Sequence, residues 1–200
     1  MVRNSSAERL NHNLKQGKRL KGKHCSLEPF SLNNETIELI HSLFSDKVLH
    51  DLINPDYPLG KSKRVISLWV RDRVQSESEE WYIIRSNNAA VGYVAYKWKV
   101  GLNLACEIST ALLSSARGFK IGFESSKLII DYIRSQRKFR HITAFCRKSN
   151  YAAIGNLRKL GFRKSNRLHI IVESELYNEK NPDPENSLYQ LMSYNTKRTH

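Results

Sequence analysis

The chain has 200 residues, of which 33 are Lys or Arg and 19 are Asp or Glu, so its formal net charge is +14. An apolar content of 40% and a charged content of 26% exclude a disordered, collagen-like or disulfide-scaffold chain. The length suits one domain, and no apolar run approaches the roughly 20 residues that span a bilayer, so we expect no membrane partner.

The amino terminus is polar and lacks the apolar segment of a signal peptide, so export is not encoded there. Three cysteines, Cys25, Cys106 and Cys146, form no close-spaced pair, which suits a reducing compartment. We therefore expect a cytoplasmic protein, and the sequence has no ligand pattern for a metal site.

The positive charge is concentrated in two parts of the chain. Residues 1–27 hold seven basic residues and one acid with almost no apolar periodicity, which predicts a flexible basic tail. Residues 114–164 hold thirteen basic residues and two acids, and supply +11 of the charge. Such a concentration favours an anionic partner, which can be nucleic acid, an anionic membrane surface or a phosphate-bearing cofactor. The alternative is a solvated basic face.

The chain after the tail is expected to begin with helices. Asn34 can cap a helix that runs through Phe44, and a short helix is expected over 47–53. Apolar residues at helical spacing predict a third helix over 65–74, after the Pro and Gly residues that break the chain before it.

From Trp81 onward β-forming residues dominate. Residues 81–86 and 89–100 flank a turn at Asn87 and Asn88 and predict a β-hairpin, and a third strand is expected over 104–113. A helix over 120–136 and a strand over 141–146 then complete a β-loop-α-β unit.

The last part of the chain is expected to hold one helix and two strands. The helix begins at Asn150 and ends at Gly161, and the strands lie at 167–176 and 188–195. Antiparallel strands followed by one crossover helix describe an α+β, mixed-sheet fold, and a doubly wound fold would need more βα alternations. We expect a single domain over 28–195.

The segment from Glu107 to Ile133 has the most informative pattern. A strand runs into a short loop over 117–122, and an amphipathic helix begins at once. Helix N-termini carry unpaired N–H groups, glycines admit a phosphate to the backbone, and Arg117 and Lys120 add charge, so the loop predicts an anion site. The alternative is a tight turn whose glycines only satisfy φ. The loop matches neither the P-loop nor the dinucleotide-binding pattern.

Two motifs resemble the GNAT superfamily of acyl-CoA-dependent N-acetyltransferases. The loop resembles their pyrophosphate loop (Gln/Arg, two residues, Gly, one residue, Gly/Ala), with Arg117 first, Gly122 last and Lys120 in place of the middle glycine. It can still bind if Lys120 adopts the local backbone angles. Downstream, Asn150-Tyr151-Ala152-Ala153-Ile154 and Lys159-Leu160-Gly161-Phe162 resemble the second motif, with Ala153 for the usual serine and Leu157 where many members carry a proton-donating tyrosine.

The resemblance covers roughly residues 26–194 and implies a fold, a cofactor and a set of contacts. The implied fold is a mixed, mostly antiparallel sheet of six to seven strands, splayed at its centre and flanked by helices. The implied acyl donor is acetyl-CoA, with its pantetheine arm along the strand before the loop. The implied cofactor-binding residues are Leu112, Leu113, Arg117, Gly118, Phe119, Lys120, Ile121, Gly122 and Asn150.

Acetyl transfer to an amine needs a group that removes the amine's proton. Glu107, at the head of the strand before the loop, is our candidate base, and the alternative is an exposed strand-end glutamate. Strand alternation puts its side chain on the face of Ser109 and Ala111. Tyr151 is the candidate proton donor in place of the missing tyrosine. Asn150 is expected to cap its helix, to reach the cofactor, or both.

The sequence therefore predicts an N-acetyltransferase that moves an acetyl group from acetyl-CoA to a primary amine of a small molecule, such as an amino sugar or a nucleotide-linked sugar, by direct attack. Alternatives are a protein N-terminal or lysine acetyltransferase, a basic nucleic-acid-binding protein and a catalytically idle acyl-CoA binder. Acetyl-CoA becomes the first explanation of the charge at 114–164, ahead of nucleic acid, but one cofactor cannot neutralise +11. The role of the tail and a homodimer stay open.

Overall fold

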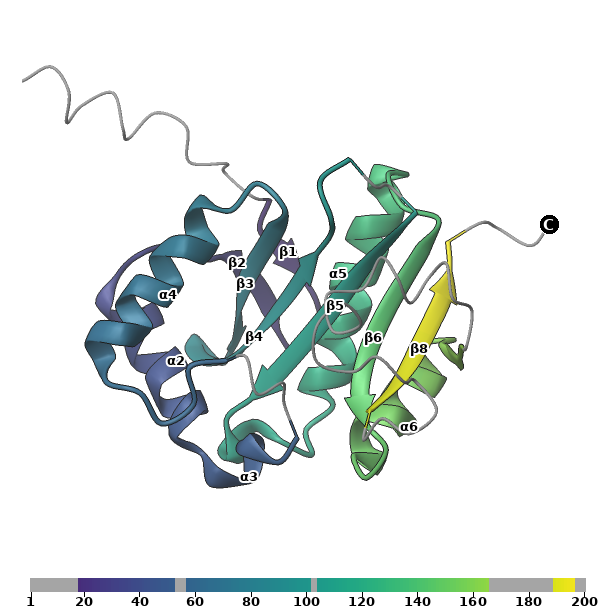
Figure 1. Cartoon of the computed structure of the whole chain (residues 1–200). Helices are drawn as coiled ribbons and strands as arrows, with labels where there is room; N and C mark the ends of the chain where they lie inside the picture. Colours follow the sequence, from purple (N-terminus) through teal and green to yellow (C-terminus); the bar gives the residue numbers. More distant parts are fainter. Residues whose placement is uncertain (1–17, 53–56, 102–103, 166–188, 197–200) are drawn as a thin grey trace, which may run out of the picture.

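The structure is a computed structural model that describes residues 18–52, 57–101, 104–165 and 189–196 (Figure 1). Its helices are α2 (Asn34–Ser45), α3 (Lys47–His50), α4 (Lys63–Gln75), α5 (Ile121–Gln136) and α6 (Tyr151–Lys159), with a 3-10 turn at Ser114–Ala116. Its strands are β1 (Leu20–Lys21), β2 (Ser26–Pro29), β3 (Glu79–Ser86), β4 (Ala89–Lys97), β5 (Ala105–Leu112), β6 (His141–Arg147), β7 (Arg163–Lys164) and β8 (Tyr189–Asn195).

The described strands form one sheet in the order β1-β2-β3-β4-β5-β6-β8-β7. Neighbours pair antiparallel except β5 and β6, which are parallel and joined by α5. The predicted mixed, mostly antiparallel α+β fold is confirmed. The two-residue strands β1 and β7 raise the number of described strands to eight, above the six to seven expected. The strand predicted at 167–176 lies outside the described residues.

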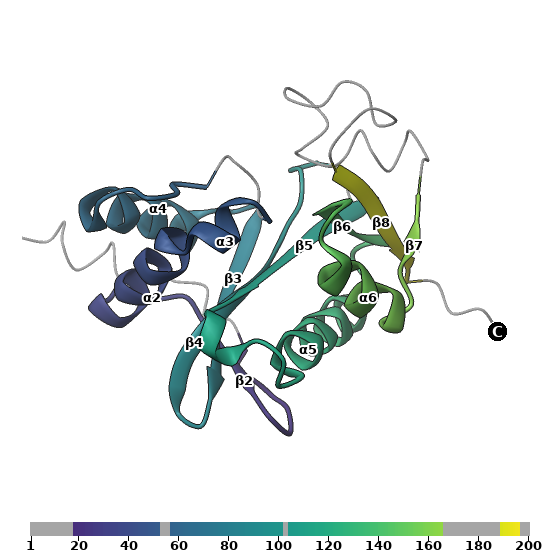
Figure 2. The same cartoon turned by 90° about the horizontal axis from the view of Figure 1, so that it is seen from below.

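Helices cover both faces of the sheet (Figure 2). Alternation along β3 sends Trp81 and Ile83 into a core with α2 and α4, and sends Tyr82 and Ile84 into a second core with α5. None of the described helices has the length and apolar character that crossing a bilayer requires.

Local signals placed most elements within a few residues. Asn87 and Asn88 both adopt positive φ, at 49° and 63°, as the predicted two-residue hairpin turn requires. The cap of α2 is Asn33 rather than Asn34, because Asn33 Oδ1 accepts the N–H of Thr36 at 2.8 Å. Helix α3 ends at His50, earlier than expected.

The amino-terminal hairpin of β1 and β2 is held by α5. The carboxylate of Glu124 accepts the backbone N–H groups of Lys23 at 2.5 Å and His24 at 2.8 Å. Desolvation alone would raise the pKa of Glu124, but these hydrogen bonds, with help from His24 and Cys25, lower it. Residues 20–21 and 26–27 therefore belong to strands of the sheet, although we expected a tail through residue 27.

We predict that Glu124→Gln destabilises the protein by about 1–2 kcal/mol at pH 7, because hydrogen bonds to a charged acceptor are replaced by weaker ones. A group with a lowered folded pKa contributes stability above its ordinary pKa, about 4.3, and loses it as the pH falls through the lowered value. The difference between the two proteins in urea unfolding should vanish as the pH falls through that window. Asp131→Asn, on the exposed side of the same helix, is the control, and an equal effect there would contradict the assignment.

Candidate functional site

Strands β5 and β6 meet at one end and then diverge (Figure 1). Their pairing runs from Ala105–His141 to Glu107–Thr143 and stops, although β5 continues to Leu112 and β6 to Arg147. A V-shaped opening in the sheet therefore begins directly beyond Glu107. The splay expected at the centre of the sheet is confirmed.

One edge of β5 presents its backbone to this opening. The N–H of Leu113 donates to Val91 O of the β4 side at 2.9 Å, whereas Cys106 O, on the other edge, accepts the Thr143 hydroxyl at 3.1 Å. Alternation then turns the polar backbone groups of Ile108 and Thr110 toward the opening. No described strand pairs with them there, and an extended amide chain fits such an edge.

The loop before α5 has the backbone of a glycine-rich anion loop. Lys120 adopts φ 62° and ψ 0°, the left-handed region that a glycine would occupy, and Gly118 has φ 90°. No side chain caps the start of α5, so its first N–H groups face the loop unpaired within the helix. Lys120 therefore has the backbone angles that the loop requires at the position of the usual middle glycine, and the loop fits a phosphate-bearing group.

The other loop residues divide into exposed and packed positions. Phe119 and Lys120 are exposed, whereas Ile121 is buried in the core under α5. A Cβ at Gly122 would lie 3.3 Å from Leu112 Cδ1, so α5 begins in close contact with the end of β5.

Arg117 is turned toward α3. Its Nε donates to Leu112 O at 3.1 Å and its Nη2 to Asp46 Oδ2 at 2.6 Å. Asp46 also caps α3 by accepting the N–H of Val48 at 2.9 Å. Burial opposes ionisation, but the Arg117 and backbone hydrogen bonds outweigh it and lower the pKa of Asp46. The charge that we expected Arg117 to add to the anion site is thus balanced by Asp46.

Glu107 is buried, with 7% of its surface exposed, so it is not the exposed strand-end glutamate of our alternative. It is the last β5 residue paired with β6, and its neighbours in register are Lys97 on β4 and Thr143 on β6. Cys106 and Ile108 pack in the core with α5, which leaves Glu107 on the opposite face, as alternation predicted.

The second motif places its residues around the start of α6. Asn150 Oδ1 accepts the N–H of Ala153 at 3.1 Å, so its capping role is confirmed. Tyr151 is 80% exposed at the start of α6, which lies on the same side of the sheet as α5 (Figure 2), whereas Glu107 lies on the opposite face. Leu157 is a buried core residue, so packing explains the apolar residue where the family's tyrosine is usual.

Two residues of this region were not found from the sequence. Asp46 precedes the predicted helix at residue 47 and is a typical N-cap, a signal that we passed over. Its pairing with Arg117, 71 positions away, has no local signature. Thr143, whose hydroxyl ties β6 to β5, is one hydroxyl within an apolar strand.

We predict that the ion pair of Arg117 and Asp46 couples the loop to α3 energetically. In a double-mutant cycle of Arg117→Ala and Asp46→Ala, urea unfolding should give a coupling energy of about 1 kcal/mol, since both side chains are partly exposed. Lys127 and Asp131, an exposed pair on α5, provide the control cycle with a smaller coupling. Additive effects of the first two substitutions would refute the coupling.

Comparisons with known proteins agree with this geometry. No curated protein sequence gives a significant match. Among solved structures, a GNAT-family acetyltransferase from Bacillus anthracis is 15% identical with a TM-score of 0.69, covering 90% of this chain and 99% of its own. The ribosomal L7/L12 alpha-N-protein acetyltransferase RimL in complex with coenzyme A is 15% identical with a TM-score of 0.71, and the match covers 89% of this chain and 98% of RimL.

A third solved structure is an acetyltransferase from Salmonella typhimurium that modifies the N-terminal serine of ribosomal protein L7/L12. It is 15% identical with a TM-score of 0.67, covering 88% of this chain and 97% of its own. At these identities the likeness establishes the fold. A sequence model of the acetyltransferase (GNAT) domain matches residues 26–163, more than half of the chain. The chain therefore belongs to the GNAT acetyltransferases, enzymes that use acetyl-CoA as the acyl donor.

Proposed function

We propose that this enzyme transfers the acetyl group directly to the α-amine of a protein or peptide amino terminus, and that the amine reacts beside Glu107. The observation that carries the proposal is the position of Glu107 at the point where β5 and β6 separate. Acetyl-CoA supplies an activated thioester carbonyl to this opening.

The chain's own groups account for binding and orientation of the donor. The backbone groups of Ile108 and Thr110 pair with its amide arm, and the first turn of α5, with Gly118 and Gly122, receives its pyrophosphate. Lys120 adds positive charge beside these N–H groups. Donor contacts from Leu113, Phe119 and Asn150 stay predictions of the family resemblance.

Direct attack is favoured because none of the three cysteines is suited to carry the acetyl group. Cys25, Cys106 and Cys146 are all buried. Burial, together with the charge of Glu124, raises the pKa of Cys25 to about 12, and burial raises the pKa of the other two thiols as well. A thiolate is the reactive form of cysteine, so these residues offer no good nucleophile.

Glu107 is the proposed base. Its carboxylate lies on the face opposite α5 and accepts a proton from the acceptor's ammonium group, directly or through one water. The neutral amine then attacks the thioester carbonyl, the C–S bond breaks, and CoA leaves as the thiolate. A carboxylate is a weak base, so the acceptor best suited to it is an amine of low pKa. An α-amine has a pKa of about 7.7–8.0 against about 10.4 for a lysine side chain, and its neutral fraction at pH 7 is therefore far larger.

The choice of an amino terminus over a lysine side chain rests on this pKa argument, and its choice over a small-molecule amine rests on the named activity of two fold neighbours, which act on a ribosomal protein amino terminus. The small-molecule amine that we predicted from the sequence, such as an amino sugar or a nucleotide-linked sugar, becomes the alternative. The cytoplasmic location, Tyr151 as proton donor and a homodimer stay predictions.

The donor placement predicts that Gly122→Val weakens acetyl-CoA binding more than tenfold in calorimetry. A branched side chain there presses on Leu112 and covers the first turn of α5. Gly155→Val on α6, where a Cβ meets no atom within 4 Å, is the matched control and should bind normally. Unchanged affinity of the Gly122 variant would exclude this placement.

The proposed reaction predicts that CoA release is faster with short peptides bearing a free amino terminus than with lysine side chains or amino sugars. Glu107→Gln should lower turnover of the peptides by about 100-fold or more, because a general base contributes at least this factor, and should leave acetyl-CoA affinity unchanged. Faster reaction with amino sugars would replace the proposed acceptor by the alternative.

The matched control is Glu80→Gln, a strand carboxylate on the opposite face of the sheet that accepts the Tyr82 hydroxyl at 2.8 Å. It should retain turnover. Full activity of the Glu107 variant would remove Glu107 as the base, and acetyl-CoA binding without transfer to any amine would favour the idle acyl-CoA binder.

A further inference from the structure

The positive charge of residues 114–164 does not gather at the donor loop. Of its thirteen basic residues, eight lie in two short segments, 134–140 and 158–164, which contain no acidic residue. The first segment ends α5 and leads into β6, and the second ends α6 and forms β7. From the sequence we expected acetyl-CoA to be the first explanation of this charge, but the fold places most of these basic residues away from the donor loop.

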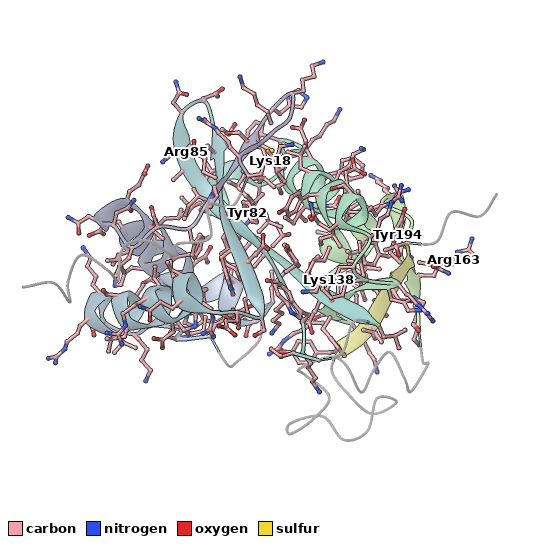
Figure 3. The ribbon with its side chains drawn as sticks, turned by 90° about the horizontal axis from the view of Figure 1, so that it is seen from above. Lys18, Tyr82, Arg85, Lys138, Arg163 and Tyr194 are labelled. Carbon is pink, nitrogen blue, oxygen red and sulfur yellow. The ribbon has the colours of Figure 1, made fainter. Side chains whose placement is uncertain are left out.

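The two segments meet at one end of the molecule, which we call the basic end. The guanidinium of Arg134 lies 5.8 Å from the ring centre of Tyr194, and a Cβ at Gly161 would lie 3.2 Å from the same ring. Arg163 pairs with Ser193 on β8, and Thr196 donates to the carbonyl of Arg140 at 3.0 Å. Figure 3 looks at this end and shows Tyr194 between Lys138 and Arg163.

The charge there is exposed and largely unbalanced within the described chain. All eight basic residues are exposed, and among the described residues the one ion pair that any of them makes is that of Arg134 with Asp131, at 3.8 Å. Lys138 packs on the Trp98 ring at 3.9 Å. Two helix C-termini carry about half a negative charge each, so they balance about one of the eight.

The donor is too far away to neutralise this end. Helix α5 has 16 residues, which at about 1.5 Å per residue separates its two ends by roughly 24 Å. The Debye length at physiological ionic strength is about 8 Å, so phosphates at the start of α5 are screened from the basic end. The charge of the described basic residues is therefore available to a separate anionic partner.

We propose that the basic end binds the phosphodiester backbone of a nucleic acid. Five of the eight residues are arginines, whose planar guanidinium groups pair with phosphate through two hydrogen bonds. None of the seven exposed large apolar side chains among the described residues belongs to either segment. A protein interface with an apolar centre, or a membrane site that inserts apolar side chains, would need apolar residues here, so this charged surface fits a phosphate backbone better than either.

The test measures binding of a fluorescein-labelled single-stranded RNA to the full chain by anisotropy, from 50 to 200 mM NaCl. The patch variant is Arg140→Gln, Arg158→Gln and Arg163→Gln together, and the control variant is Lys61→Gln, Arg64→Gln and Arg71→Gln, which removes the same charge from exposed positions at α4. The logarithm of the binding constant falls linearly with the logarithm of the salt concentration, and each lost phosphate contact should reduce the magnitude of this slope by about 0.7. The slope of the patch variant should therefore be smaller by about 2. Its affinity should fall at least tenfold, with the control unchanged.

Equal losses in the two variants would overturn the proposal. So would tighter binding of a polyglutamate peptide or of anionic phosphatidylserine vesicles, since these outcomes assign the basic end to a protein or a membrane. Duplex RNA and DNA in parallel identify the preferred strand form. The patch and control variants are also compared in a chain that carries Arg3→Gln, Arg9→Gln and Lys15→Gln. If the patch substitutions no longer weaken RNA binding in that chain, the proposal is also contradicted. Acetyl-CoA affinity should be unchanged in every variant, which keeps this test separate from that of the transfer reaction.

Discussion

The site depends on the short parallel contact between β5 and β6. Three residue pairs join the strands, and beyond Glu107 and Thr143 the sheet opens. Because β6 stays paired with β8 and β5 with β4, each strand is held on its far side while its near edge is left to a ligand. An open edge inside a sheet, rather than a pocket of side chains, is what this fold offers to an extended amide chain.

The start of α5 is where separate parts of the chain are tied together. Glu124 holds the β1–β2 turn on one side, and Arg117 holds α3 on the other through Asp46. Both contacts lie within a few residues of Lys120, whose left-handed backbone is unusual for a side chain with a Cβ. Contacts with distant segments therefore stabilise a loop conformation that its own sequence does not favour.

Local patterns predicted the elements well, because hairpin turns, helix caps and strand alternation are read over a few residues. The turn at Asn87 and Asn88, the cap at Asn150 and the side of the sheet taken by Glu107 follow from such patterns. Pairing across the chain could not be read in this way. The partner of Arg117, the anchoring of residues 18–27 by Glu124 and the separation of the charge from the loop depend on which segments the topology brings together.

The anion loop relies on main-chain groups, with the nearest arginine already paired to Asp46. The backbone N–H groups at the start of α5 do not titrate over the physiological range. Capture of a diphosphate by this loop is therefore insensitive to acidity over the physiological range. Under the proposed function, the acceptor amine and the carboxylate of Glu107 are then the groups of the reaction centre whose titration a rate profile against pH would report.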